Sequence, residues 1–69
     1  MKGIVTHIDY QNGFVTVETN IGSTVFELLG DYEINIGDVI IGNLDFLGEE
    51  QLKNSSAGET IDVFIQNNS

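Results

Sequence analysis

The feature that most constrains the fold is the alternation of apolar and polar residues on both sides of Asn12-Gly13. A period of two residues is typical of a β-strand that is buried on one face. An Asn-Gly pair between two such runs favours a two-residue type I′ turn, because both central positions of that turn need a positive φ. The first twenty residues therefore predict a β-hairpin.

The turn also predicts the register of this hairpin. With Asn12 and Gly13 at the tip, the facing pairs are Gln11–Phe14, Tyr10–Val15, Ile8–Val17, Thr6–Thr19 and Ile4–Ile21. A shift by one residue would mix apolar with polar side chains on each face, so the pattern itself favours this register. We expect an inner face made of Ile4, Ile8, Tyr10, Val15, Val17 and Ile21.

Three further strands follow from alternation and β-branched residues. They are predicted at Thr24–Leu29, at Val39–Ile41 continuing to Leu44, and at Thr60–Gln66. Gly42, inside the second of them, predicts a bulge or a sharp bend. In the last one, Ile61, Val63 and Ile65 are expected on one face.

The remaining segments predict loops and one domain. Residues Gly48–Glu59 are polar with little periodicity, which favours a loop. We expect residues 1–66 to form a single small β-barrel domain and residues 67–69 a polar, frayed tail. Five short strands without proline or a convincing helix predict an all-β fold, a small five-stranded antiparallel barrel.

This pattern of strands resembles small OB-type barrels, including the cold-shock and S1-like modules. The stretch Ile36–Gly42, which reads IGDVIIG, carries most of the resemblance, together with the Asn/Gly turn after the first strand. An SH3-like barrel would give nearly the same pattern and remains the alternative. The resemblance implies a fold whose members bind oligonucleotides, oligosaccharides or other proteins.

The charge of the chain argues against nucleic acid as a partner. Asp and Glu number 11 against two cations, Lys2 and Lys53, and the net charge is −9. Affinity for DNA or RNA depends largely on Lys and Arg that neutralise phosphates. The aromatic side chain most exposed in the predicted register, Phe14, could stack on a base, but Asp9 and Glu18 share its face. An acidic surface instead favours solubility or a basic partner.

Composition also bears on the compartment. The chain has no Cys, which excludes disulfides and favours a reducing compartment. No apolar run approaches the roughly 20 residues of a membrane span, and the first residues lack the long apolar segment of a signal peptide. We therefore expect a cytoplasmic protein with no membrane segment.

Metal and cofactor sites are not predicted. Counted from Asp31 as an EF-hand loop, Glu33 and Asn35 fit the ligand positions, but position 6 is Ile36 and position 12 is Gly42. The sharp turn and the bidentate Glu of that loop are both missing. Weak divalent-cation binding by this acidic segment is kept as an alternative function.

No catalytic residues are predicted, and we expect the protein not to be an enzyme. His7, the single His, would face Glu18 across the hairpin, where a carboxylate would raise the pKa of the imidazole and form a pH-sensitive pair. Ser55 and Ser56 lie in the predicted loop without a base near them in sequence.

The sequence thus favours a non-catalytic binding or accessory module that contacts another protein or a second copy of itself. A small core gains stability from association, and the open edges of an incompletely closed barrel would accept an added strand. Phe14, Leu47 and Leu52 are the candidate contact residues. An oligonucleotide- or oligosaccharide-binding module is the alternative.

Overall fold

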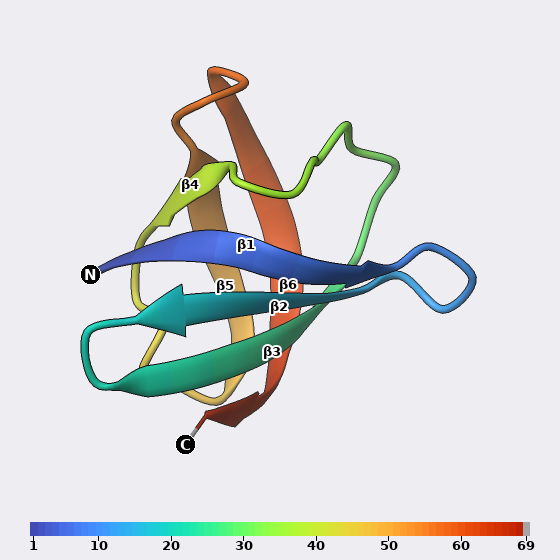
Figure 1. The fold of residues 1–69 in the computed structure, drawn as a ribbon. Helices are drawn as coiled ribbons and strands as arrows, with labels where there is room; N and C mark the ends of the chain where they lie inside the picture. Colours follow the sequence, from blue (N-terminus) through green and yellow to red (C-terminus); the bar gives the residue numbers. More distant parts are fainter. Residues whose placement is uncertain (69) are drawn as a thin grey trace.

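Six β-strands make up most of residues 1–68, the part of the chain that the computed structural model describes (Figure 1). Their bounds are β1 Lys2–Asp9, β2 Phe14–Thr19, β3 Gly22–Leu28, β4 Val39–Ile41, β5 Gly48–Asn54 and β6 Glu59–Asn68. They form one closed barrel in the order β1-β2-β3-β6-β5-β4, and every neighbouring pair is antiparallel. The predicted all-β antiparallel barrel is confirmed, with six strands in place of five.

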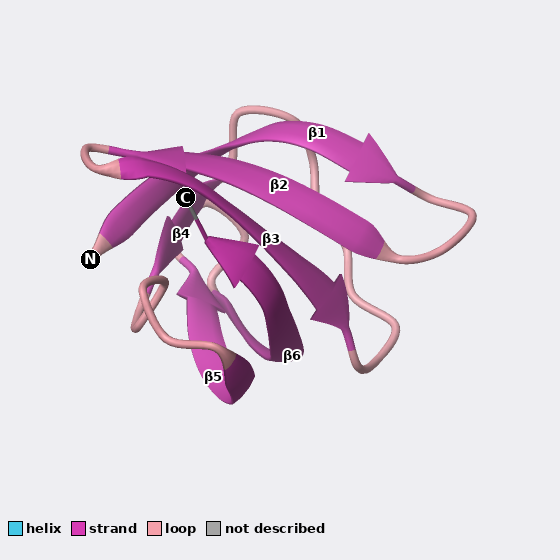
Figure 2. Cartoon of the chain, turned by 90° about the horizontal axis from the view of Figure 1, so that it is seen from below, coloured by secondary structure: helices cyan, strands magenta, loops and turns pink. Residues whose placement is uncertain are grey.

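The connectivity is that of a Greek key followed by a second meander (Figure 2). Strands β1, β2 and β3 follow one another, and residues 29–38 carry the chain back so that β4 lies beside β1. Strands β5 and β6 then complete the circle, because β6 pairs with β3. Closure of the barrel removes the two open edges that we expected for strand addition.

Residues 1–68 contain no helix of the length and apolarity needed to cross a membrane.

The first hairpin is present, but its register differs from the prediction. Asp9 pairs with Phe14, so the connection is a four-residue loop, Tyr10–Gly13. Gly13 has a φ of 74°, whereas Asn12 does not have a positive φ, and the turn is therefore not of type I′. The Asp9 carboxylate explains the wider loop, because it accepts hydrogen bonds from the backbone amides of Gln11 and Asn12.

A bulge in β1 changes which residues face inward. The register shifts between Val5 and His7, so the alternation reverses at this point. Val5 is therefore buried and Ile4 exposed, while Tyr10 and Ile21 are 75% and 66% exposed. The predicted inner face is correct for Val15 and Val17, which are buried, and wrong for these three exposed residues.

The segment predicted as a loop contains β5. Leu52 and Asn54 point into the barrel and are buried, whereas Glu49, Gln51 and Lys53 alternate with them on the outside. Because these outer residues are charged or polar, the hydropathy of the segment did not indicate a strand. At the other end of the sheet, β6 continues to Asn68, which pairs with Thr24, so residues 67 and 68 are not a frayed tail. Residue 69 of that predicted tail lies outside the described residues.

The interior is filled by apolar side chains from all six strands and from two loops. Phe26 is buried at its centre, and Ile61, Val63 and Ile65 share the inner face as predicted. The full core comprises Val5, Val15, Val17, Phe26, Ile34, Ile40, Leu44, Leu52, Ile61, Val63 and Ile65.

Strand β4, which closes the barrel, has only three residues and is held by turns at both ends. Before it, Gly37 donates a hydrogen bond to the carbonyl of Val5 (2.8 Å), and the Val5 amide donates to the carbonyl of Asp38 (2.9 Å). After it, the predicted bend is confirmed at Gly42, where φ is 150° and a Cβ would lie 2.6 Å from Leu52 Cδ2. The close approach of β4 to β5 therefore requires glycine at this position.

Candidate functional site

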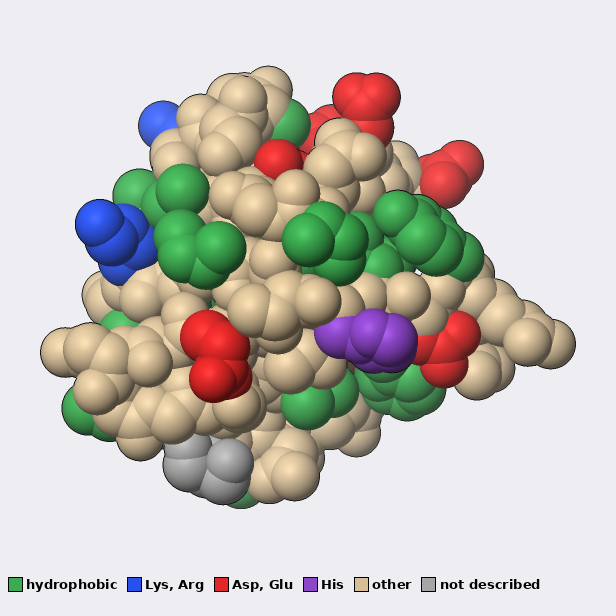
Figure 3. Space-filling model, viewed as in Figure 1, with side chains coloured by type: hydrophobic (Ala, Val, Ile, Leu, Met, Phe, Trp, Pro, Cys, Tyr) green, Lys and Arg blue, Asp and Glu red, His purple; other side chains and the backbone are tan. Residues whose placement is uncertain are grey.

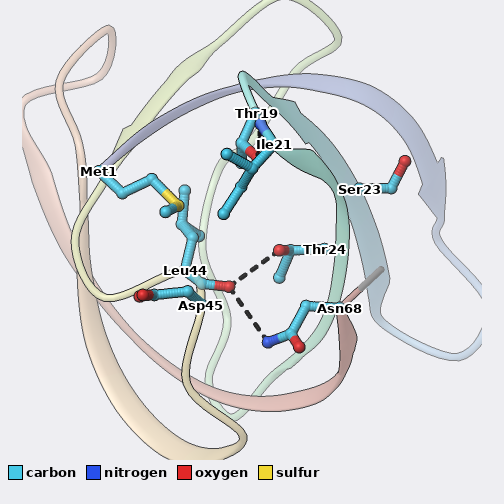
Figure 4. A pocket seen from close by; sticks show the side chains of 8 residues that line it. All are labelled: Met1, Thr19, Ile21, Ser23, Thr24, Leu44, Asp45 and Asn68. Atoms are coloured by element: carbon cyan, nitrogen blue, oxygen red, sulfur yellow. Dashed lines mark hydrogen bonds between the residues drawn. The ribbon is translucent and has the colours of Figure 1, made fainter.

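One hollow lies at an end of the barrel, against the start of β3 and the end of β6 (Figure 4). Its polar groups bond to one another: Thr24 Oγ1 donates to the carbonyl oxygen of Leu44 (2.8 Å), and Asn68 Nδ2 donates to the same oxygen (3.4 Å). The hollow has a volume of about 110 Å³. Ligand pockets usually have at least about 300 Å³, so this hollow is small for a ligand, and its Thr24 and Asn68 side chains are bonded to the loop at Leu44.

The segment Asp31–Asp38, where the sequence partly resembles a calcium loop, has a structural use for its last carboxylate. Asp38 Oδ2 accepts hydrogen bonds from the amide of Asn35 (2.9 Å) and from Asn54 Nδ2 (2.8 Å). Asp31 and Glu33 are exposed. Within residues 1–68, no group of three or more His, Cys, Asp or Glu side chains is arranged to hold a metal ion.

The predicted pair of His7 and Glu18 does not face each other. The bulge in β1 places His7 opposite Thr16 and Glu18 opposite Ile4. The Glu18 carboxylate instead accepts a hydrogen bond from the hydroxyl of Ser23. The prediction of a cross-strand pair was therefore wrong, because it was counted through a two-residue turn and an unbroken strand.

The surroundings of Asp9, at the end of β1, lower the pKa of its carboxyl group. The side chain of Asn12 donates to Asp9 Oδ2 (3.0 Å) and, together with the amides of Asn12 and Gln11, holds the pKa of Asp9 below its ordinary value of 3.8. His7, two residues earlier on the strand, acts in the same direction through its charge. This carboxylate is committed to the hairpin loop.

The two serines are also committed to backbone contacts. Ser55 Oγ donates to the carbonyl of Val39 (3.2 Å), and Ser56 Oγ accepts from the amide of Val39 (3.0 Å). Both hydroxyls therefore fasten the closing strand β4 to the loop between β5 and β6.

The three candidate contact residues differ in how far they are exposed. Leu47 is 66% exposed and remains available to a partner. Phe14 is half-buried on the outer side of β2. Leu52 is 1% exposed, so it cannot form part of a contact surface; it belongs to the inner face of a strand that the sequence did not reveal.

Phe14 belongs to a row of side chains that runs across the outer surface of four neighbouring strands. Phe14 in β2 pairs with Glu27 in β3, Glu27 pairs with Phe64 in β6, and Phe64 pairs with Glu49 in β5. Phe64 is 42% exposed and Glu49 is exposed. We call Phe14, Glu27, Phe64 and Glu49 the acidic–aromatic row.

The row is ordered by its surroundings. Gln66 Nε2 donates a hydrogen bond to Glu27 Oε1 (3.3 Å), which orients this carboxylate on the outer surface. Directly paired side chains of neighbouring strands have Cβ atoms about 4.5–5.5 Å apart, so the four side chains of the row are neighbours on the outer surface. The row thus presents two aromatic rings and two negative charges side by side.

Sequence reasoning found only Phe14 of these four residues. The row joins residues that are up to 50 positions apart in the chain, and it exists only through the pairing of β3 with β6 and of β6 with β5. Hydropathy shows that Glu27 and Phe64 occur in alternating segments, but it shows neither the strand that contains Glu49 nor which strands are neighbours.

Comparison with known proteins does not extend this description. No protein-family model, no curated protein and no solved structure matches the chain. The site therefore has to be interpreted from its own chemistry.

Proposed function

We propose that this protein is a non-catalytic protein-binding module that contacts its partner through the outer surface of an OB-like barrel, with the acidic–aromatic row as the contact surface. OB-type barrels bind through the face of their second and third strands, and the row crosses β2 and β3. The observation that carries the proposal is the alternation of ring and carboxylate over four neighbouring strands.

The chemistry of the row fits a basic protein surface. A Lys or Arg of the partner can form a charge-assisted hydrogen bond with a carboxylate while its alkyl chain packs on the adjacent phenyl ring. Aromatic side chains, phenylalanine included, are enriched at protein interfaces. A polyanion would instead be repelled by a chain with a net charge of −9.

The row also explains why large apolar side chains can remain outside. The core is complete without them, since eleven apolar residues are already buried inside the closed barrel. Phe64 is therefore not needed to fill the interior and can remain on the outer surface. A partner that covers it removes this apolar area from water.

Titration with a short peptide that alternates lysine and leucine tests the proposal. Amide shifts in two-dimensional NMR should move in a saturable manner at the row. The double variant Glu27→Gln/Glu49→Gln should bind the peptide about tenfold more weakly, as expected for the loss of two exposed ion pairs. The control Asp31→Asn/Glu33→Gln removes the same charge from an exposed loop and should retain the affinity.

Two results would contradict the proposal. If the control variant loses as much affinity as the row variant, the peptide responds only to net charge. If a single-stranded oligonucleotide binds more tightly than the peptide at ordinary ionic strength, the barrel is a nucleic-acid-binding module instead.

A further inference from the structure

The chain carries a surface that is complementary to its own acidic–aromatic row. Lys2 in β1 pairs with Ile41 in β4, and Ile41 pairs with Lys53 in β5. Both lysines are exposed and Ile41 is 42% exposed. We call Lys2, Ile41 and Lys53 the basic triplet. It contains every Lys and Arg of the chain.

Figure 3 shows two blue side chains beside a group of hydrophobic side chains, over β4 and the start of β1. Ile4, which pairs with Val39 of β4 and is 39% exposed, adds apolar area beside the triplet. Both lysines of the protein thus lie on the two strands that flank the closing strand.

The triplet matches the central part of the row in spacing and in order. In the row, Phe64 lies between Glu27 and Glu49 on the two strands beside β6. In the triplet, Ile41 lies between two lysines on the two strands beside β4. Neighbouring strands are about 4.8 Å apart, so the Cα atoms of the two like-charged residues are about 10 Å apart in both surfaces.

We propose that the partner of this module is a second copy of the same chain, docked with its acidic–aromatic row on the basic triplet. This inference depends on the proposed function, because it names the partner of the same row. Ile41 meets Phe64 of the next copy, and each lysine meets a carboxylate. Such contacts combine an apolar centre with charges at the rim, as specific interfaces do.

The geometry makes the contact heterologous. The triplet is centred on β4 and the row on β6, and β5 separates the two strands in the barrel. A copy that docks through its triplet alone leaves its row free for another copy. Contacts of this kind produce a ring when the rotation closes and an open chain when it does not.

An open hollow beside Lys2 of the triplet supplies room for the second aromatic ring of the row. It has a volume of about 440 Å³ and is lined by Lys2 and Ile4 on one side and by Glu18 on the other. The Glu18 carboxylate is turned toward Ser23, whose hydroxyl donates a hydrogen bond to it. When Glu27 of the next copy faces Lys2, the phenyl ring of Phe14, which lies beyond Glu27 in the row, is placed over this hollow.

The net charge sets the conditions for association. Two copies with a charge of −9 each repel one another at long range. At about 0.15 M salt this repulsion is largely screened beyond roughly 8 Å, whereas groups in direct contact are screened much less. Association of the copies should therefore be measured at about 0.15 M salt.

A charge exchange tests the inference. The first variant is Lys2→Glu/Lys53→Glu, and the second is Glu27→Lys/Glu49→Lys. Sedimentation equilibrium of the wild type should give a mass that rises above 7.6 kDa with concentration. Each variant alone should stay monomeric, because its two surfaces then carry like charges. An equimolar mixture should associate again, since one variant supplies lysines wherever the other supplies carboxylates.

The mixture is the decisive sample. Both variants keep a net negative charge, so restored association cannot come from general attraction between them. The control Asp31→Lys/Glu33→Lys changes the net charge as much as the second variant but leaves the row intact, and it should associate like the wild type. Circular dichroism confirms that each variant keeps its β-sheet content.

Three results would overturn the inference: a wild type that stays monomeric up to millimolar concentration, a mixture that fails to associate, or a control that loses association as fully as the second variant. The first of these leaves the peptide titration of the row unaffected, so the module could still bind another basic protein. Failure of the peptide titration together with a monomeric wild type would overturn both proposals.

Discussion

The two sides of the barrel are built by different means. On one side, β3 and β6 pair over most of their length, and Phe26 and Ile65 meet in the interior. On the other side, the closing strand β4 has three residues and pairs with β5 only through Ile40 and Ile41. Apolar packing dominates the first side and hydrogen bonds from loops dominate the second.

This difference shows how a short strand can close a barrel. Buried polar groups cost free energy unless they are paired, and the buried amide beside β4 is paired. Asn54 is fully buried and joins the Asp38 carboxylate on one side to the amides of Ser56 and Ala57 on the other. The closing side is thus held by a few hydrogen bonds with defined directions. The two sides also carry opposite charges outside, lysines beside β4 and carboxylates beside β6.

The largest expected effect is on the apolar side. Phe26→Ala removes the largest buried side chain and should lower the free energy of unfolding by about 3–5 kcal/mol. A domain of this size has roughly that much stability, so the variant should be largely unfolded. Urea denaturation followed by circular dichroism measures this.

Val25→Ala, one position earlier on the same strand and half-buried on the outside, is the matched control for this substitution. It should cost less than about 1 kcal/mol. Equal losses in the two variants would contradict the assignment of the inner and outer faces of β3.

On the closing side, Asn54→Ala should cost about 2–3 kcal/mol. The substitution removes the buried side chain that bonds two backbone amides of the loop and Asp38 Oδ2. Asn43→Ala removes a surface hydrogen bond of 3.4 Å to Glu50 and should cost less than about 0.5 kcal/mol. Hydrogen exchange should show that Asn54→Ala opens β4 before it opens β3, and simultaneous opening would contradict the comparison.

Gly42→Ala should cost about 1–3 kcal/mol, since alanine would be strained at a φ of 150° and its Cβ would meet Leu52 at 2.6 Å. Gly13→Ala separates the two causes, because Gly13 has a φ of 74° and no atom within 4 Å of the added Cβ. Thermal unfolding of both variants gives the comparison. A smaller loss for Gly42→Ala than for Gly13→Ala would show that β4 does not lie against Leu52 as described.

The smallest effect concerns Asp9, which lies on neither side. Its pKa is lowered in the folded protein, so its charged form stabilises the loop above the ordinary value of 3.8, and this contribution disappears as the pH falls through the lowered pKa. The difference in Tm between wild type and Asp9→Asn should therefore be present at neutral pH and shrink below pH 3.8. In an Asn12→Ala background the difference should be smaller, and an unchanged difference would rule out Asn12 as the main cause.

The sequence predicted the parts of the fold that depend on neighbours along the chain. The last strand, the closing strand and the bend at Gly42 all follow from local alternation, β-branched residues and glycine. The register of the first hairpin failed for a local reason as well, because one carboxylate, Asp9, widened the turn and a bulge reversed the alternation after Val5. The hydropathy pattern indicates neither the wider turn nor the bulge.

The candidate site was less predictable, because it depends on pairing between distant strands. Leu52 appeared to be a surface residue because β5 carries Glu49, Gln51 and Lys53 on its outer side and reads as a polar loop. Phe64 appeared to be an ordinary strand residue until its two glutamate neighbours were known. A row across a sheet becomes visible only when the order of the strands is given.

The central claim is that the two oppositely charged surfaces of one chain recognise each other. Amide chemical shifts followed on dilution of the uniformly ¹⁵N-labelled wild type at about 0.15 M salt test it most directly. Concentration-dependent shifts should be confined to the basic triplet, the acidic–aromatic row and their immediate neighbours. Shifts concentrated at the exposed hairpin loop around Tyr10, or no shifts at any concentration, would contradict it.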